Sequence, residues 1–253
     1  MSKKAILIEA CVSSVPCAME AQRGGARRVE LCDNLWDGGT TPSAGAIEAA
    51  RRELSIGLNV IIRPRGGDFV YTELEMAIMR RDVELAKELG ADGIVIGMLH
   101  PDGSLQLEQY RELIELARPM SVTSHRAFDM CRDPMEALEQ LIELGVDRIL
   151  SSGQRPSAME GSELLAELVE KAGERILIMP GVGINTGNIG ELIRRTGARE
   201  YHVFAQRQAA STMQFRNEAV FMGSDPDFDE FAIPISDAEA FREICRIAEA
   251  SRA

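Results

Sequence analysis

The sequence contains no apolar stretch that approaches the ~20 residues needed to cross a bilayer, so no transmembrane helix is expected. The opening apolar run, Ala5–Ile8, is too short for a signal peptide and is interrupted by Glu9. Basic residues are also scarce, with 28 Lys and Arg against 40 Asp and Glu, for a formal net charge of −12. Nucleic acids and anionic membranes are poor partners for such a chain, because they bind clustered cationic side chains.

Cysteine is sparse, and several catalytic signatures are missing. The five cysteines form no dense, even framework, so we expect reduced thiols in a cytoplasmic protein rather than disulfides. Gly-x-Ser-x-Gly, His-Glu-x-x-His and Walker-type patterns do not occur. The residues after the first predicted strand, Cys11-Val12-Ser13-Ser14, do not form the glycine-rich turn of a dinucleotide-binding fold.

What is present is a regular alternation of strand and helix patterns. A glycine that can cap a helix in the left-handed conformation, followed by one or two polar residues and an apolar run, recurs at Gly25, Gly90, Gly145 and Gly197. The predicted strands are Ala5–Glu9, Arg28–Cys32, Leu58–Arg63, Gly93–Gly97, Ser121–His125, Arg148–Ser152, Ile176–Pro180 and Glu200–Phe204. Helices are predicted between strands, for example at Glu73–Leu89, Leu107–Ala117, Pro134–Leu144 and Glu160–Ala172, with a final helix at Asp237–Ala250.

Repetition of this unit predicts βαβ crossovers and a parallel sheet. Eight units in 253 residues match the usual size of a (β/α)8 TIM barrel, and we expect one domain over residues 1–253. A doubly wound open sheet is the alternative. Residues 205–234 are predicted to be irregular, and their length suggests a functional loop, an interface segment or extra local structure.

Polar residues follow or end many of the predicted strands, where barrel enzymes place their active sites. We expect Arg63, Arg65 and Arg126, with Asp129, to bind a small anionic substrate, and Glu9, Glu30 or His125 to transfer a proton. The alternative is structural, with Glu9–Arg63 or Glu30–Arg65 ion pairs filling the barrel mouth. Gly181 and Gly183 follow the seventh strand and suggest either a phosphate-binding loop or a tight turn.

Cys11 and Cys32 follow or end the first two predicted strands. Adjacent strands lie ~4.8 Å apart, so these two thiols can approach each other. A pair of thiolates suits Cu(I), a soft metal ion, better than a hard one. The alternative is that both residues are small buried hydrophobic side chains.

Several long motifs together resemble the CutC copper homeostasis family, and the likeness runs from the first strand to Phe215-Arg216-Asn217. The motifs are Glu9-Ala10-Cys11, Gly25–Cys32, Gly38–Ser43, Ile62-Arg63-Pro64-Arg65-Gly66-Gly67-Asp68-Phe69, His125-Arg126-Ala127-Phe128-Asp129 and Ser151-Ser152-Gly153-Gln154.

The resemblance implies a cytoplasmic barrel, a homodimer or larger homo-oligomer, and Cu(I) binding at the positions of Cys11 and Cys32. Val203 and Phe204 stand where family members have small residues, and Val12 replaces a cysteine often found beside Cys11. The sequence therefore supports two hypotheses: a copper homeostasis protein that binds Cu(I), or a barrel enzyme acting on a phosphorylated or carboxylated sugar-like substrate.

Overall fold

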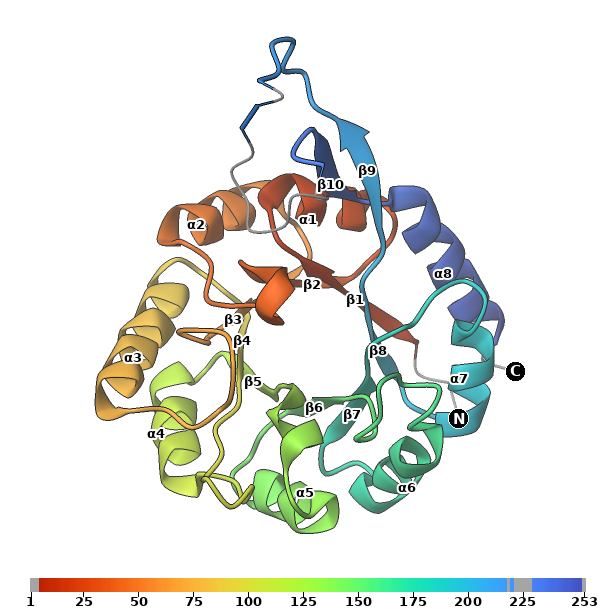
Figure 1. The fold of residues 1–253 in the computed structure, drawn as a ribbon. Helices are drawn as coiled ribbons and strands as arrows, with labels where there is room; N and C mark the ends of the chain where they lie inside the picture. The colour runs from red at the N-terminus through yellow and green to blue at the C-terminus, as the bar shows by residue number, and fades with distance from the viewer. Residues whose placement is uncertain (1–4, 218, 221–228, 252–253) are drawn as a thin grey trace.

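The computed structural model describes residues 5–217, 219–220 and 229–251. In this part of the chain, eight parallel strands form a barrel inside a ring of helices (Figure 1). The barrel strands are β1 (Leu7–Val12), β2 (Arg28–Leu31), β3 (Gly57–Ile61), β4 (Gly93–Ile96), β5 (Ser121–Ser124), β6 (Arg148–Ser151), β7 (Leu177–Pro180) and β8 (Glu200–Val203). Neighbouring strands follow chain order from β1 to β7, and β8 pairs with β1. A parallel bridge between Gly181 and His202 joins the β7 and β8 sides, and the predicted (β/α)8 barrel is confirmed.

The helices begin and end where the local sequence dictates. Thr72 and Glu75 form a reciprocal capping box at the start of α3, and Gly90 and Gly145 have the positive φ angles predicted for them, 84° and 72°. The α-helices are α1 (Val15–Arg23), α2 (Ala44–Glu53), α3 (Glu73–Glu88), α4 (Leu107–Ala117), α5 (Pro134–Glu143), α6 (Ser162–Ala172), α7 (Ile189–Thr196) and α8 (Ala238–Ala250), and two short 3-10 helices are η1 (Leu35–Asp37) and η2 (Arg126–Met130). No helix in the described ranges is both long and apolar enough to span a bilayer.

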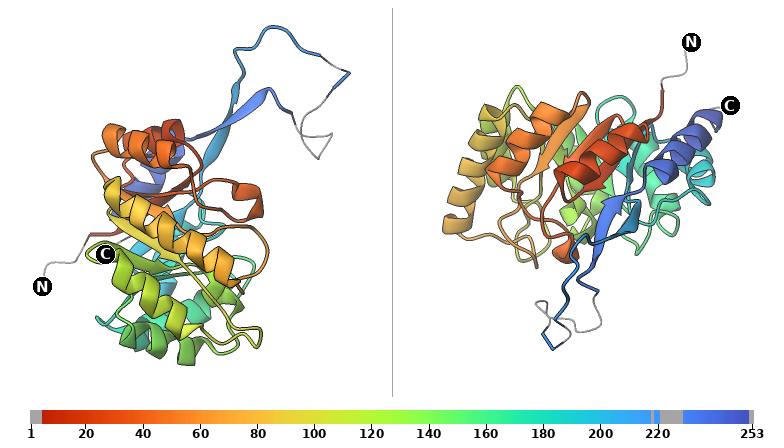
Figure 2. Two further views of the ribbon diagram at one scale, coloured as in Figure 1. Left: turned by 90° about the vertical axis from the view of Figure 1, so that its left-hand side faces the viewer. Right: turned by 90° about the horizontal axis from the view of Figure 1, so that it is seen from above.

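Between β8 and α8 the chain forms an antiparallel ribbon of β9 (Gln206–Ala210) and β10 (Ala232–Ser236), which projects away from the barrel (Figure 2). Segment 205–234 is therefore not irregular throughout, because its two ends pair with each other. The interpretation as extra local structure holds for these ends, and residues 218 and 221–228 lie outside the described part.

The barrel interior is charged toward the amino-terminal ends of β2, β6 and β8, which begin at Arg28, Arg148 and Glu200. The parallel register sets Glu9 of β1 opposite Arg28 of β2, and the Arg28 guanidinium donates hydrogen bonds to the carboxylates of Glu9 and Glu200. Arg148 extends this network, with its Nε 3.1 Å from Glu200 Oε2 and its Nη1 3.2 Å from Ser121 Oγ. Burial alone would lower the pKa of Arg28, but the charges of Glu9 and Glu200 raise it above its usual value.

This network corrects two expectations. The strand bodies are not purely apolar, because Glu9, Arg28, Arg148 and Glu200 all lie within strands and are at most 8% exposed. The first strand also continues through Cys11 to Val12 instead of ending at Glu9. The sequence predicts that Glu9 ends the first strand, because it is charged. Inside the barrel Arg28 on the neighbouring strand neutralises this charge, so the strand continues past it.

Replacing Arg28 with alanine should destabilise the fold by about 3–5 kcal/mol, because Glu9 and Glu200 would keep buried charges without their shared cation. Denaturant unfolding followed by circular dichroism measures the loss. Arg175→Ala is the matched control, since it removes a guanidinium from an exposed pair with Glu139 and should change the midpoint little. Equal stability of the Arg28 variant and the wild type would contradict a structural role for the network.

Candidate functional site

A pocket of about 370 Å³ opens at the carboxyl ends of the barrel strands. Seven of the residues predicted from the sequence line it: Cys11, Glu30, Cys32, Arg63, His125, Arg126 and Gly183. The other lining residues are Leu35, Asp37, Gly38, Ile61, Phe69, Leu150, Val182, His202 and Phe204. Four predicted residues, Glu9, Arg65, Asp129 and Gly181, are not among them. The structure thus brings most of the predicted site together, on residues from both halves of the chain.

The two thiols predicted to approach each other do so. Ligand atoms of Cys11, Cys32 and Glu30 all lie within 4.8 Å of one another. A hydrogen bond from the Cys32 thiol and contact with His202 lower the pKa of Cys11 to about 5, although burial opposes the shift. The same hydrogen bond, together with burial, raises the pKa of Cys32 well above its usual value. The pair therefore holds one thiolate and one thiol at neutral pH.

His202 is the site residue to which the sequence assigned no role. Its Nδ1 lies 2.8 Å from Glu9 Oε1, and its Nε2 lies 3.4 Å from Glu30 Oε2. Burial would lower the pKa of His202, but hydrogen bonds with Cys11 and Glu9 raise it well above its usual value. The β1–β8 register creates this contact between residues 193 positions apart in sequence, so only knowledge of which strands close the barrel could have revealed it.

The two glutamates predicted to transfer protons differ in charge. Burial would raise the pKa of Glu9, but the charge of Arg28 and the His202 hydrogen bond lower it to about 2, so it stays ionised. Burial raises the pKa of Glu30 to about 8, so it is largely protonated at neutral pH. Glu30 Oε1 is buried and has no hydrogen-bond partner among the described residues. Of the two, only Glu30 combines contact with the pocket and a proton to give.

Arg63 anchors the loops at the pocket wall. Its Nη1 donates to the carbonyl oxygens of Asp37 at 2.6 Å and Gly39 at 2.8 Å, and its Nη2 donates to that of Gly67 at 2.7 Å. Its Nε is buried without a hydrogen-bond partner in the described chain. The Glu9–Arg63 ion pair of the structural alternative is not formed, because Arg28 lies in register with Glu9 and neutralises it.

His125 is held in one tautomer. Its Nδ1 accepts a hydrogen bond from the Ala127 N–H at 3.1 Å, so the hydrogen of the neutral ring resides on Nε2, which has no partner in the described residues. Burial and the nearby charge of Arg63 lower the pKa of His125 to about 3. The ring is therefore a neutral hydrogen-bond donor at physiological pH. Gly97 permits the ring position, since a Cβ there would lie 2.3 Å from His125 Cε1.

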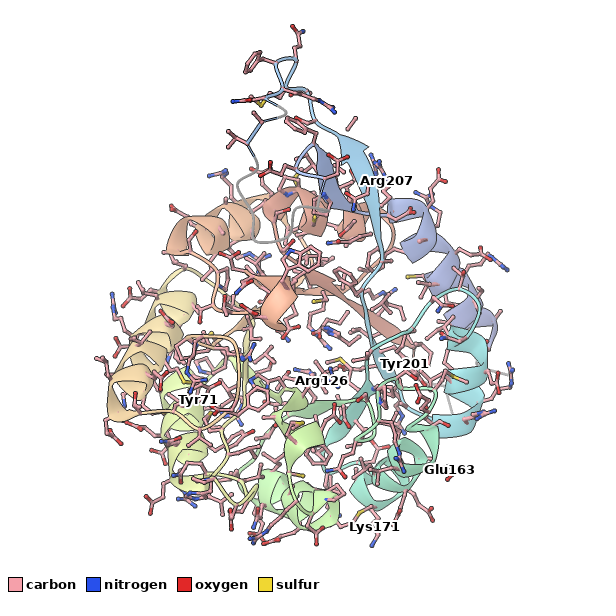
Figure 3. All side chains as sticks on the ribbon, in the orientation of Figure 1. Tyr71, Arg126, Glu163, Lys171, Tyr201 and Arg207 are labelled. Carbon is pink, nitrogen blue, oxygen red and sulfur yellow. The ribbon has the colours of Figure 1, made fainter. Side chains whose placement is uncertain are left out.

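Asp129 positions other groups instead of facing the pocket. Its two carboxylate oxygens accept from Ser151 Oγ at 2.6 Å, from the Ser152 and Gln154 N–H groups, and from Arg126 Nε at 2.8 Å. With both oxygens occupied, Asp129 orders the loop after β6 and orients Arg126. The guanidinium of Arg126 also contacts Ser152 Oγ and lies near the barrel axis (Figure 3).

Arg65 lies away from the pocket, despite its place in the Arg63–Phe69 motif. Its guanidinium contacts the carboxylates of Glu75 and Asp68 and lies 5.2 Å from the centroid of the Tyr71 ring. Tyr71 lies toward the helical ring, whereas Arg126 is central (Figure 3). The Glu30–Arg65 pair of the structural alternative is therefore not formed, because Arg65 pairs with Glu75 and Asp68 outside the pocket that Glu30 lines.

The glycines after β7 form a tight turn. Gly181 pairs with His202, and a Cβ there would lie 2.5 Å from Leu150 Cδ1. Val182 and Gly183 both have positive φ angles, 78° and 73°, and the Gly183 carbonyl accepts from the Asn188 side chain at 2.7 Å. This arrangement matches the tight-turn interpretation of the sequence, with Gly183 at the pocket edge.

The imidazole of His125 should remain neutral, with its hydrogen on Nε2, from pH 8 down to pH 5. Its pKa of about 3 places protonation below this range, whereas an unperturbed histidine would titrate near 6.5. Long-range ¹H–¹⁵N correlation spectra of the histidine rings report both tautomer and charge, and a His125→Phe variant identifies the resonance. Titration of that resonance near pH 6.5 would contradict the buried donor.

Comparison with known proteins assigns the chain to a family. The CutC family model matches residues 6–207. A CutC family protein from Parabacteroides distasonis is 53% identical over 234 residues, covering 92% of this chain and 96% of the relative. The copper homeostasis protein cutC homolog of Homo sapiens is 45% identical over 243 residues, covering 96% of this chain and 89% of the relative.

Solved structures agree with this assignment. A CutC crystal structure from Streptococcus agalactiae has a TM-score of 0.75 and 37% identity, covering 78% of this chain and 97% of that one. Thiamine phosphate pyrophosphorylase from Pyrococcus furiosus has a TM-score of 0.59 over 98% of both chains, but at 18% identity it shares only the fold. The chain belongs to the CutC family.

Proposed function

We propose that this protein acts in copper homeostasis as a cytoplasmic homo-oligomer that binds Cu(I) through Cys11 and Cys32. The observation that carries the proposal is the adjacency of these two sulfur atoms on the pocket floor, one of them ionised at neutral pH. The relatives from Homo sapiens and Mus musculus are described as copper homeostasis proteins, which agrees with this assignment.

The donor set fits Cu(I). Thiolates are soft ligands and select Cu(I) over hard cations. Cys11 is partly exposed and Cys32 is buried, so an ion can arrive from the pocket and be held away from water. When bound, Cu(I) supplies a soft cation that neutralises thiolate charge. The protein's own part is to hold the two sulfurs on neighbouring strands and to lower the pKa of Cys11.

The remaining free cysteines do not share this environment. Cys17 is buried on α1 and its Sγ contacts the Pro234 carbonyl at 3.7 Å, while Cys245 lies on α8 and Cys131 follows η2. None of the three lines the pocket. They provide matched controls for thiol substitution in the same chain.

Cys11→Ser and Cys32→Ser should each weaken Cu(I) binding by more than about 100-fold, because each removes a direct ligand. Loss of a residue that only supports a ligand typically costs roughly 10–100-fold in metal affinity. Competition with a chromophoric Cu(I) chelator under anaerobic conditions measures the affinity. Cys245→Ser should bind as the wild type does. Unchanged Cu(I) affinity in the Cys11/Cys32 double variant would refute the proposal.

A second function is favoured by a different wall of the pocket, which contains no soft ligand. The Nε2–H of His125 is a hydrogen-bond donor without a partner among the described residues, and the guanidiniums of Arg63 and Arg126 line the same pocket. Buried donors without partners are costly, and an oxygen of a bound anion would satisfy them. Glu30, protonated at neutral pH, could act as a general acid. These features support an enzyme acting on a small anionic, sugar-like substrate.

Carboxylated and phosphorylated sugars provide the test for this second function. A ligand present at 100 times its Kd should stabilise the protein by about 2.7 kcal/mol, seen as a rise in Tm. His125→Phe keeps a ring against Phe69 but removes the donor, so it should reduce the shift, whereas His100→Gln, outside the pocket, should not. Absence of any shift at millimolar ligand across the panel would count against an anionic substrate.

A further inference from the structure

The thiol pair does not stand alone on the pocket floor. Ligand atoms of Cys11, Glu30 and Cys32 lie within 4.8 Å of one another, and so do those of Glu9, Glu30 and His202. Glu30 belongs to both sets, so it links the sulfur cluster to the histidine. These residues come from β1, β2 and β8, which are hydrogen-bonded neighbours in the barrel, or directly follow β2 in the case of Cys32.

The imidazole of His202 is arranged as a metal ligand would be. Glu9 is a carboxylate and can only accept, so the hydrogen bond of 2.8 Å places a hydrogen on His202 Nδ1 and directs Nε2 toward Glu30. Glu9 is itself fixed by Arg28 and by Asn59, whose Nδ2 lies 3.3 Å away. A carboxylate that accepts from one ring nitrogen while the other binds a cation is a common outer-shell arrangement around metal ions.

Glu30 supplies an independent indication of a bound cation. Its side chain is 5% exposed, and its Oε1 has no hydrogen-bond partner in the described part of the chain. A buried carboxyl oxygen without a partner is costly, and a cation bound at Glu30, the residue that the two groups share, would displace its proton and satisfy this oxygen.

The chemistry of the four donors indicates which cation fits. Two-thiolate binding of Cu(I) has no need of a carboxylate oxygen or an imidazole nitrogen. Cysteine sulfur, histidine nitrogen and glutamate oxygen together are the ligand types of protein-bound Zn²⁺, which is borderline between hard and soft. The extra donors are therefore unexplained by Cu(I) alone.

We propose that Cys11, Cys32, Glu30 and His202 form a single four-donor site for a borderline divalent cation of the Zn²⁺ class, with Glu9 as the residue that positions His202. This inference rests on the proposed thiol site and extends it, because the two sulfurs serve both ions while Glu30 and His202 serve only the divalent one. The pocket gives the ion access, since all four donor residues line it.

Co²⁺ alone is a suitable probe, because four-coordinate Co²⁺ with thiolate ligands gives intense visible bands and a near-ultraviolet charge-transfer band. Wild-type protein, reduced and metal-free, should develop both on titration, and Zn²⁺ should abolish them. Glu30→Gln and His202→Gln should each weaken Zn²⁺ binding by at least ~10-fold. Cu(I) affinity should fall much less than Zn²⁺ affinity in Glu30→Gln, because both sulfur atoms remain in place, whereas His202→Gln also removes a contact that lowers the pKa of Cys11. Glu9→Gln should weaken Zn²⁺ binding by about 10–100-fold as a positioning effect.

Two controls keep these results interpretable. His100→Gln changes a histidine outside the pocket and should bind Co²⁺ as the wild type does. Circular dichroism and thermal melts identify any variant that fails to fold, and Glu30→Gln, which preserves the side-chain shape, carries the test if the His202 or Glu9 variants are unstable.

The outcomes separate this inference from the Cu(I) proposal. Loss of Co²⁺ bands in the Glu30 and His202 variants with retained Cu(I) binding supports the four-donor site. Wild-type protein that binds Cu(I) but not Co²⁺ or Zn²⁺, or variants that bind divalent ions unchanged, overturns the four-donor site and leaves the Cu(I) proposal intact. Divalent binding with Cu(I) affinity insensitive to both cysteines overturns the Cu(I) proposal instead.

Discussion

The structure depends on neutralising buried charge inside the barrel. Arg28 donates to both Glu9 and Glu200, and Arg148 donates to the same Glu200 oxygen as Arg28. Ions removed from water at this depth are costly unless paired, so each member fixes the position of the next. The strand register determines which of these residues pair. The pairs in turn disfavour any other register, because a shift of one residue would turn the charged side chains toward the apolar layer between the sheet and the helices.

This network also connects the barrel interior to the chemistry above it. Glu9 is bound by Arg28 on one side and by His202 on the other, so the cation in the interior determines the orientation of an imidazole on the pocket floor. The pocket has two chemically different walls. One gathers soft and borderline donors around Cys11 and Glu30, and the other presents hydrogen-bond donors from Arg63 and His125. A ligand that spans the pocket would contact both.

Much of this arrangement could be predicted from the sequence, and the exceptions have physical causes. The alternation of apolar runs with glycine-capped helices determines the barrel, and adjacency of the first two strands places Cys11 near Cys32. The alternative in which Glu9 pairs with Arg63 is wrong in its partner, because pairing depends on register, which sequence patterns do not contain. Arg63 and Arg65 are two positions apart in an irregular loop, where the alternation rule of strands does not apply, and only Arg63 reaches the pocket. The tautomer of His125 depends on a backbone N–H two residues away, and the role of His202 depends on barrel closure.

The contact between Glu9 and His202 spans 193 positions, from the first barrel strand to the last. Ordering so long a loop carries an entropic cost that is recovered only when β8 joins β1. During synthesis, His202 leaves the ribosome after four fifths of the chain. A nascent chain or a truncated product therefore has the sulfur atoms but not the imidazole, and it cannot offer the complete donor set. The proposed four-donor site therefore becomes available only once β8 has joined β1, so its occupancy would report closure of the barrel.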